Sequence, residues 1–184
     1  YRAVRILKEV DLIAAEDTRN SIKLLNYFEI KTKMTSYHEY NKVDKAVYLV
    51  NKLRGSEAFV KGLSLVVEDN GKIVGHIILT KVKIGNNESL ALAPLAVLPN
   101  YQKSGIGSKL IIESHKRAKE LGYSSVIVLG HPDYYPRFGY KPASKWGIKA
   151  PFEVPDESFM AIELIENGLK DISGTVNYAK EFFE

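Results

Sequence analysis

The chain has 184 residues, 45% hydrophobic and 26% charged, with a net charge of +4. This composition is typical of a globular domain, and the lack of cysteine excludes disulfides, thiolate metal sites and a cysteine nucleophile. No apolar run approaches the roughly 20 residues of a membrane span, so we expect no membrane partner and a cytoplasmic location. Residues 1–55 hold 11 Lys/Arg and 7 Asp/Glu. That excess is too weak to predict nucleic acid as a partner.

The first 55 residues alternate between helical patterns and short apolar runs. Their spacing predicts, in chain order, a helix, a strand, a helix, a strand and a helix over residues 3–10, 11–15, 18–28, 29–37 and 41–55. Thr18 is suited to cap the second helix, and Gly55 is the expected end of the third.

Three apolar runs follow, at residues 63–69, 72–84 and 89–98. Asn70-Gly71 between the first two is the strongest short-range hairpin signal. A polar, glycine-containing turn separates the second run from the third, so we predict an antiparallel meander over 63–98. Pro94 cannot donate a ladder hydrogen bond, so it marks an edge or a bulge.

The third strand passes into a helix through a turn that contains two glycines, Gly105 and Gly107, and no acidic residue. A helix N-terminus offers free N–H groups and a partial positive charge, and glycines let a phosphate approach the backbone. The alternative is a tight turn that needs glycine for its geometry alone. The predicted helix covers 106–121 and ends at Gly122.

Three further elements follow this helix. We predict a buried strand, an aromatic turn and a last strand, over residues 124–130, 133–140 and 159–165. We find neither an internal repeat nor a Pro/Gly-rich linker between the elements, so the sequence gives no composition-based domain boundary.

Residues from about 50 to the C-terminus resemble the GNAT superfamily of N-acetyltransferases, in its bacterial YhbS-type subgroup. "LAVLPNYQKSGIGSKLI" fits the pyrophosphate motif of that family at Gln102, Gly105 and Gly107. "YYPRFGY" fits its aromatic motif at Tyr135 and, further on, at Gly139-Tyr140. The resemblance implies a mixed α/β fold, with a central, mostly antiparallel sheet flanked by helices.

The resemblance also implies acetyl-CoA as cosubstrate and a small-molecule or peptide amine as acceptor, without a metal. The residues expected to bind acetyl-CoA are Leu95, Ala96, Val97, Gln102, Lys103, Ser104, Gly105, Ile106, Gly107 and Ser108. Tyr135 matches the family's general acid, and His131, at the end of a strand, is the candidate base.

Other interpretations of these residues stay open. Tyr134 and Tyr135 could be packing residues, because paired aromatics usually are. His76 lies in the middle of a strand and fits a core or surface position, and Glu88 at a turn fits a solvated one. A dinucleotide-binding interpretation of Gly105-Ile106-Gly107 fails, since the third glycine position is Leu110.

The first part of the chain resembles a different family. Residues 2–42 are similar to a fragment of ribosomal RNA small subunit methyltransferase I, and "LIAAEDTR" and "TSYHEYN" carry the likeness. The later cofactor-binding segments of that family are missing, so we do not expect methylation with S-adenosylmethionine. A chimera, a fused gene fragment and an error in the sequence would each account for the combination.

We interpret 1–184 as a single acetyltransferase-like domain. Residues 51–184 are its acetyl-CoA-binding core, and residues 1–50 fill the positions of its first strand and helices. The expected activity is acetyl transfer from acetyl-CoA to a primary amine. The alternatives are a non-catalytic acyl-CoA-binding module, whose acceptor site the N-terminal segment disrupts, and a methyltransferase fragment. The acceptor and the oligomeric state, a homodimer included, stay open.

Overall fold

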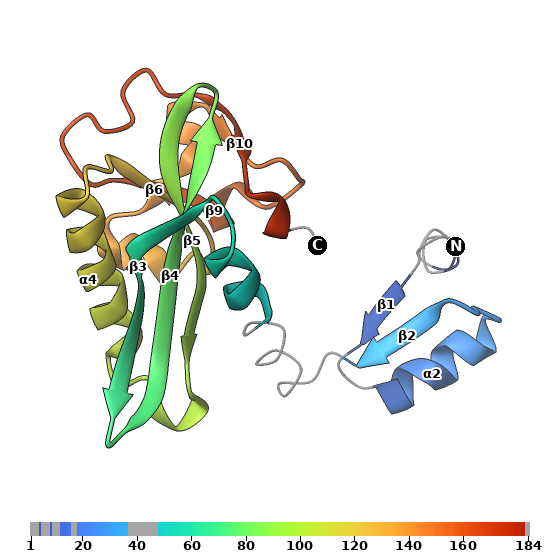
Figure 1. The fold of residues 1–184 in the computed structure, drawn as a ribbon. Coiled ribbons are helices and arrows are strands. Elements are labelled where there is room, and N and C mark those ends of the chain that lie inside the picture. The colour runs from blue at the N-terminus through green and yellow to red at the C-terminus, as the bar shows by residue number, and fades with distance from the viewer. Residues whose placement is uncertain (1–3, 5–7, 9–11, 16–17, 37–47, 183–184) are drawn as a thin grey trace. The chain divides into compact units, whose positions relative to one another are not determined.

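The computed structural model divides the chain into two compact units, Tyr1–Tyr48 and Leu49–Glu184 (Figure 1). The residues that it describes are 4, 8, 12–15, 18–36 and 48–182. Residues 4 and 8 are helical, and the rest of the helix predicted over 3–10 lies outside the described residues. The same holds for the first part of the helix predicted over 41–55, whose described part is helical from 48 to 54.

The first unit contains a β-α-β arrangement. Strand β1 (Leu12–Ala15) pairs in parallel with β2 (Lys33–Ser36), and α2 (Thr18–Tyr27) connects them along the chain. The predicted elements over 11–15, 18–28 and 29–37 are thereby confirmed, with a shorter second strand. Within residues 22–32 of this unit, Leu25 and Ile30 are buried.

The second unit is built on a mixed sheet. Its strands are β3 (Phe59–Asp69), β4 (Lys72–Ile84), β5 (Asn87–Val97), β6 (Ser125–Leu129), β7 (Lys141–Pro142), β8 (Ile148–Lys149), β9 (Phe159–Glu163) and β10 (Gly174–Asn177). They lie in the order β7-β9-β6-β5-β4-β10-β8, and β3 also pairs with β4. The pairs β5–β6 and β8–β10 are parallel and the others are antiparallel. The predicted fold class, a mixed α/β fold with a central, mostly antiparallel sheet flanked by helices, is confirmed, and the helices are few.

The predicted meander is present as β3, β4 and β5. Asn70 and Gly71 have φ angles of 49° and 78°, the left-handed conformation of a two-residue hairpin turn. The register of β4 against β5 shifts between Ile77 and Leu79, opposite the segment that holds Pro94. Pro94 thus lies at a bulge, as predicted, and its peptide bond with Ala93 is cis.

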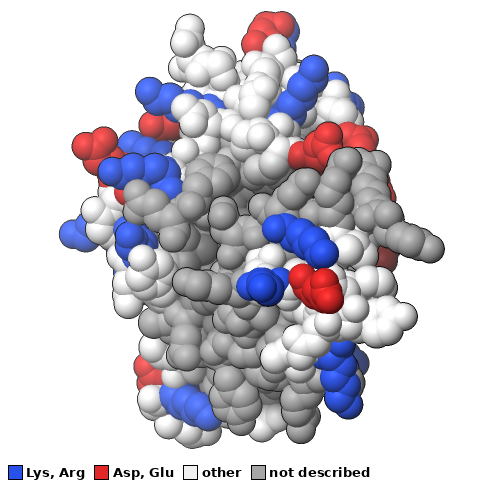
Figure 2. All heavy atoms as spheres, turned by 90° about the vertical axis from the view of Figure 1, so that its right-hand side faces the viewer, with Lys and Arg blue, Asp and Glu red and all other residues white. Residues whose placement is uncertain are grey.

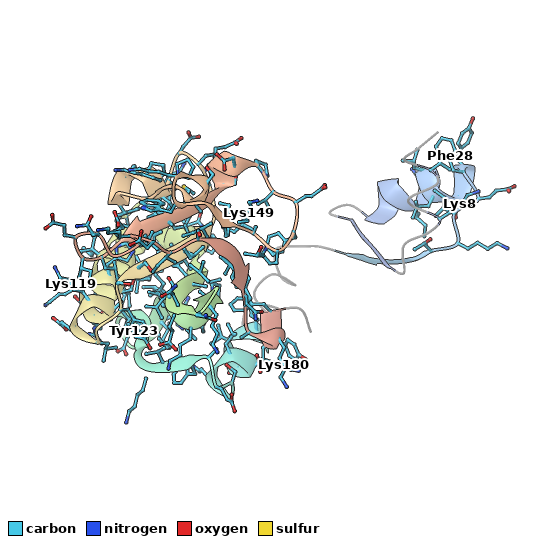
Figure 3. All side chains as sticks on the ribbon, turned by 90° about the horizontal axis from the view of Figure 1, so that it is seen from above. Lys8, Phe28, Lys119, Tyr123, Lys149 and Lys180 are labelled. Atoms are coloured by element: carbon cyan, nitrogen blue, oxygen red, sulfur yellow. The ribbon has the colours of Figure 1, made fainter. Side chains whose placement is uncertain are left out.

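Helix α4 (Ile106–Glu120) packs on one face of the sheet, beside β3 and β4 (Figure 1). A Cβ on Gly75 of β4 would lie 2.7 Å from Cγ2 of Ile106, so glycine lets the helix approach the strand closely. Leu110, Ile111 and Ala118 are buried on this face. Lys119 lies near the C-terminal end of α4 (Figure 3).

The helix predicted over 106–121 is confirmed, except that it is one residue shorter. The helix ends at Glu120, and Leu121 at its C-cap is 51% exposed. The remaining short helices of the second unit are 3-10 turns: η1 (Pro99–Tyr101), η2 (Tyr135–Phe138), η3 (Ala143–Trp146), η4 (Asp156–Ser158) and η5 (Lys180–Phe182). Within the described ranges, every helix is too short or too polar to cross a membrane.

Candidate functional site

Strands β5 and β6 separate as they approach the N-terminus of α4. Their parallel pairing covers Leu90 with Val126 and Ala91 with Ile127. Beyond this point β5 continues to Val97 paired with β4, and β6 continues paired with β9. The backbone of residues 95–97 therefore has one edge that pairs with β4 and a second edge on the side of the opening.

The turn between β5 and α4 has the features of an anion-binding loop. Gly105, the N-cap residue of α4, has a φ of 85°, and a Cβ there would meet no atom within 4 Å. Glycine is thus favoured by its left-handed backbone conformation and not by lack of space for a side chain. The first turn of α4 has no acidic residue and no side-chain cap. Its N–H groups, from Ile106 to Ser108, have no acceptor within the helix and can bind an anion.

Two side-chain hydrogen bonds hold this turn, one to the end of β5 and one within the turn itself. The amide Nε2 of Gln102 donates to the carbonyl oxygen of Val97 at 3.2 Å, and the hydroxyl of Ser104 donates to the carbonyl oxygen of Tyr101. Lys103 between them has a φ of 61° and an exposed side chain. The structure therefore gathers the predicted cofactor-binding residues of the turn around one end of the opening.

Glycine is needed at position 107 for a different reason than at position 105. A Cβ on Gly107 would lie 2.7 Å from the hydroxyl oxygen of Tyr134. Tyr134 thus connects the aromatic turn with the first turn of α4, a contact that sequence reasoning missed. The guanidinium of Arg137 lies 4.5 Å from the centroid of the Tyr134 ring, and its Nε donates to the Tyr134 carbonyl oxygen at 3.2 Å.

Tyr135 is 9% exposed and begins η2, the next element along the chain after β6. A Cβ on Gly130 would overlap with the Tyr135 ring, so this glycine is needed for the ring to fit. Burial, and secondly the neighbouring Tyr134, raise the pKa of Tyr135 to about 12. The phenol is therefore protonated at neutral pH and is chemically able to donate a proton.

His131 lies in the same turn as Tyr135, with its side chain in solvent. Its carbonyl oxygen accepts hydrogen bonds from the backbone N–H groups of Tyr134 at 3.0 Å and Tyr135 at 3.4 Å. The side chain is 76% exposed, and its Nδ1 lies 3.8 Å from a carboxylate oxygen of Asp133. The imidazole can therefore exchange protons with water.

A second histidine belongs to a hydrogen-bonded chain that the sequence did not indicate. Nη2 of Arg54 donates to the hydroxyl oxygen of Ser64 at 2.9 Å, and that oxygen lies 3.1 Å from Nε2 of His76. Burial, and secondly Arg54, lower the pKa of His76. His76 lies on β4 opposite Ala96 of β5, so a neutral imidazole lies one strand away from the opening.

A cavity of about 730 Å³ lies apart from these residues. It is lined by Gly55, Ser56, Glu57, Ala58, Lys81, Val82, Lys83, Glu88 and residues 177–181, and it includes none of the predicted site residues. Glu88, predicted to be solvated, forms an ion pair with Lys81 at 3.5 Å and is 47% exposed. On the face that Figure 2 shows, basic and acidic side chains are interspersed over the described surface.

Comparison with known proteins gives a family for the second unit. The family model of the acetyltransferase (GNAT) domain matches residues 61–142. YjhQ, an uncharacterized N-acetyltransferase of Escherichia coli K12, is 41% identical over 118 residues, which are 61% of this chain and 65% of YjhQ. The chain thus spans slightly less than two thirds of the length of that relative.

Two solved structures have the same fold. The GNAT family N-acetyltransferase YhbS from Escherichia coli, in complex with CoA, has a TM-score of 0.71 and 28% identity, over 77% of this chain and 79% of YhbS. A GNAT family acetyltransferase from Brucella melitensis, in complex with acetyl-CoA, has a TM-score of 0.60 and 28% identity, over 91% of this chain and 95% of that one.

The N-terminal resemblance is also confirmed as a short, partial match. Ribosomal RNA small subunit methyltransferase I of Halalkalibacterium halodurans is 57% identical over 53 residues, which are 29% of this chain and 18% of the methyltransferase. The two matches concern different families, and the larger one coincides with the unit that contains the opening between β5 and β6. Through this unit, the chain is similar to the GNAT family of N-acetyltransferases.

Proposed function

We propose that this chain transfers an acetyl group from acetyl-CoA to a primary amine. The observation that carries the proposal is the separation of β5 from β6 beside the uncapped N-terminus of α4. The solved relatives from Escherichia coli and Brucella melitensis, which bind CoA and acetyl-CoA, support it because their fold and family are the same.

The residues around the opening fit the chemistry of CoA. The N–H groups from Ile106 to Ser108 suit a pyrophosphate, and the left-handed Gly105 leaves space for it to approach. Lys103 adds a positive charge to the same turn. The backbone edge of Leu95–Val97 that does not pair with β4 suits the amides of the pantetheine arm, as a strand edge suits an added strand, although the Val97 carbonyl oxygen already accepts from Gln102.

Tyr135 and His131 are the proposed proton-transfer groups. Bound acetyl-CoA would supply a thioester as the acyl donor. His131 would accept the proton that the acceptor's ammonium group must lose before the neutral amine attacks the thioester. Its exposed imidazole can pass that proton to water. Tyr135 would donate the proton at its hydroxyl oxygen to the sulfur that leaves. His76 is the competing candidate for the base, since its pKa is lowered and it is neutral at pH 7.

The binding step is tested by thermal unfolding with acetyl-CoA and S-adenosylmethionine in parallel. A ligand at a hundredfold excess over its Kd stabilises the native state by about 2.7 kcal/mol. We expect stabilisation by acetyl-CoA alone. Stabilisation by S-adenosylmethionine alone would contradict the proposal.

Substitution of Ser108 makes this test specific for the turn. Ser108→Asp places a negative charge in the first turn of α4, which favours the helix but repels a pyrophosphate. Ser108→Asn is the matched neutral control. We expect Ser108→Asp to lose the response to acetyl-CoA and Ser108→Asn to keep it. An equal response of both variants would place the phosphates elsewhere.

Catalysis is tested by release of CoA from acetyl-CoA in the presence of amines. Tyr135→Phe is expected to lower turnover about 100-fold with little change in acetyl-CoA binding, because a positioned acid contributes roughly that factor. Binding without turnover on any amine would instead favour the non-catalytic acyl-CoA-binding module. A larger loss in His76→Ala than in His131→Ala would transfer the role of base to His76.

The organisation of the domain stays a prediction. Residues 51–184 are proposed to hold the complete acetyl-CoA site, and residues 1–50 to occupy the positions of the first strand and helices of the family. In the part of the chain that the structure describes, β1 pairs with β2. The cytoplasmic location, the acceptor class and a homodimer also remain predictions.

A further inference from the structure

Tyr135 lies in a socket formed by three neighbours. The backbone of Gly130 contacts one side of its ring. Tyr134 contacts it edge to face, with ring centroids 5.3 Å apart. Tyr140 does the same, with ring centroids 5.5 Å apart and an angle of 77° between the planes. Gly130 and Tyr134 precede Tyr135 in the chain, whereas Tyr140 follows η2 and the left-handed Gly139.

The third neighbour is fixed from another element. Nε2 of His115, on α4, lies 2.9 Å from the hydroxyl oxygen of Tyr140. Tyr140 is 2% exposed, and burial raises the pKa of its phenol well above the ordinary value. Burial also lowers the pKa of His115 to about 4. At neutral pH the hydrogen bond therefore joins a protonated phenol and a neutral imidazole.

We propose that His115 is a positioning residue for acetyl transfer: through its hydrogen bond to Tyr140, it holds the Tyr140 ring against Tyr135 and fixes the direction of the Tyr135 hydroxyl. The inference rests on the proposed function, in which Tyr135 is the acid. His115 itself does not contact Tyr135 in this scheme, and its effect passes through the Tyr140 ring.

Helix α4 thereby supports two parts of the site. Its first turn offers the N–H groups for phosphate, and His115 lies nine residues after Ile106. At about 1.5 Å of rise per residue, the two points are ~14 Å apart along one rigid helix. In the proposed scheme, the helix can thus set the position of the acid relative to the phosphates.

A purely structural role for His115 gives different expectations. A buried tyrosine hydroxyl needs a hydrogen-bond partner, and His115 supplies one whatever Tyr135 does. In that case, substitutions of His115 would lower stability and leave the Tyr135 ring where it is. The two accounts therefore differ in whether the Tyr135 ring moves when His115 is substituted. This can be observed without knowing the amine acceptor.

The test uses the full chain with ¹³C-labelled tyrosine rings. The Tyr135 signal is identified by its absence in Tyr135→Phe. His115→Gln places an amide near the position of Nε2, whereas the shorter His115→Asn cannot reach Tyr140, and Tyr140→Phe removes the other partner. We expect the Tyr135 signal to shift or broaden in His115→Asn and Tyr140→Phe, and to stay near its wild-type position in His115→Gln.

Turnover is measured on the same proteins as CoA release from acetyl-CoA, with a polyamine, an aminoglycoside and a lysine peptide as probes. We expect kcat to fall about 10-fold in His115→Asn and Tyr140→Phe, with KM for acetyl-CoA nearly unchanged, and to recover in His115→Gln. If no amine reacts with the wild type, the proposed acetyl transfer fails. The ring signals then still decide whether His115 positions Tyr135. An unchanged Tyr135 signal in both His115→Asn and Tyr140→Phe would overturn the inference, as would a His115→Gln signal that moves as in His115→Asn.

Discussion

The two units of the chain differ in how they bury apolar surface. In Leu49–Glu184, α4 and the sheet enclose a core that includes Leu79, Leu90 and Ile111, each nearly inaccessible to solvent. In Tyr1–Tyr48, the described helix α2 buries Leu25 but leaves Leu24 56% and Tyr27 80% exposed. Both units form regular secondary structure, so the local sequence is sufficient to specify helices and strands. Burial of their apolar side chains additionally needs other helices and strands to pack against.

The difference agrees with the two matches. The chain matches 79% of YhbS, and α4 and the strands of the second unit pack against one another within 49–184. The first unit matches 18% of a methyltransferase, and exposed apolar side chains on a helix are what a segment of a larger core would present. The single tryptophan, Trp146, lies in the second unit, so its fluorescence reports the unfolding of that unit alone.

The largest expected effect is a core truncation in the second unit. Leu79→Ala removes a fully buried side chain and should lower the free energy of unfolding by about 2–5 kcal/mol. Leu25→Ala is the matched truncation in the first unit. It should leave the urea midpoint of Trp146 fluorescence unchanged and alter only the circular dichroism of the helices. An equal shift of the fluorescence midpoint by both variants would show that the two units unfold together.

Next in size is a pH effect on the second unit. The pKa of His115 is lowered to about 4 from an ordinary 6.5, so the unfolded chain binds a proton more readily in this range. The free energy of unfolding is therefore highest above pH 6.5 and decreases as the pH falls toward 4. The total decrease due to His115 is about 3 kcal/mol. Urea unfolding followed by Trp146 fluorescence at pH 7.5, 5.5 and 4.5 measures this decrease. His115→Gln is the control.

That control separates His115 from His76, whose pKa is lowered too. His115→Gln should show a weaker loss of stability on acidification than the wild type. If both proteins lose the same free energy between pH 7.5 and 4.5, His115 is not buried as the structure shows it.

The elements that the sequence predicted best are those with local signals. Asn70-Gly71 specifies its own hairpin, and β4 has the predicted bounds, Lys72–Ile84. By contrast, β7, β8 and β10 were missed. Lys141–Pro142 is two residues long and contains a proline, so it is a strand only because β9 pairs with it. Such strands depend on tertiary contacts and leave no periodic pattern.

The candidate site was predictable to a similar extent. Gly105 and Tyr135 belong to motifs, and the structure places them in an open turn and a closed socket. The roles given to them stay predictions. His115 was missed because a lone histidine in a helix carries no signal by itself. Its spacing from the buried Ile111 and Ala118 places it near the inner face of α4, which could have indicated it.

A smaller effect of opposite sign is expected at Thr80. Its hydroxyl is buried and has no hydrogen-bond partner among the described residues. Thr80→Val replaces that hydroxyl with a methyl group of similar size and should raise the free energy of unfolding by about 1 kcal/mol. Trp146 fluorescence in urea measures the change. A loss of stability would mean that the hydroxyl has a partner in solution, and Thr80→Ser, which keeps the hydroxyl, would then be the less damaging variant.

The smallest effect is expected on the exposed side of α2. Tyr27 is 80% exposed, so Tyr27→Ser should change the free energy of unfolding by less than about 0.5 kcal/mol, as measured by circular dichroism in urea. Leu25→Ser, at a 6% exposed position of the same helix, is the control that should destabilise the first unit. A loss above about 1 kcal/mol in Tyr27→Ser would mean that α2 is covered in solution. The contrast between the buried core of the second unit and the exposed side of α2 would then fail, because α2 would have a partner that covers Tyr27.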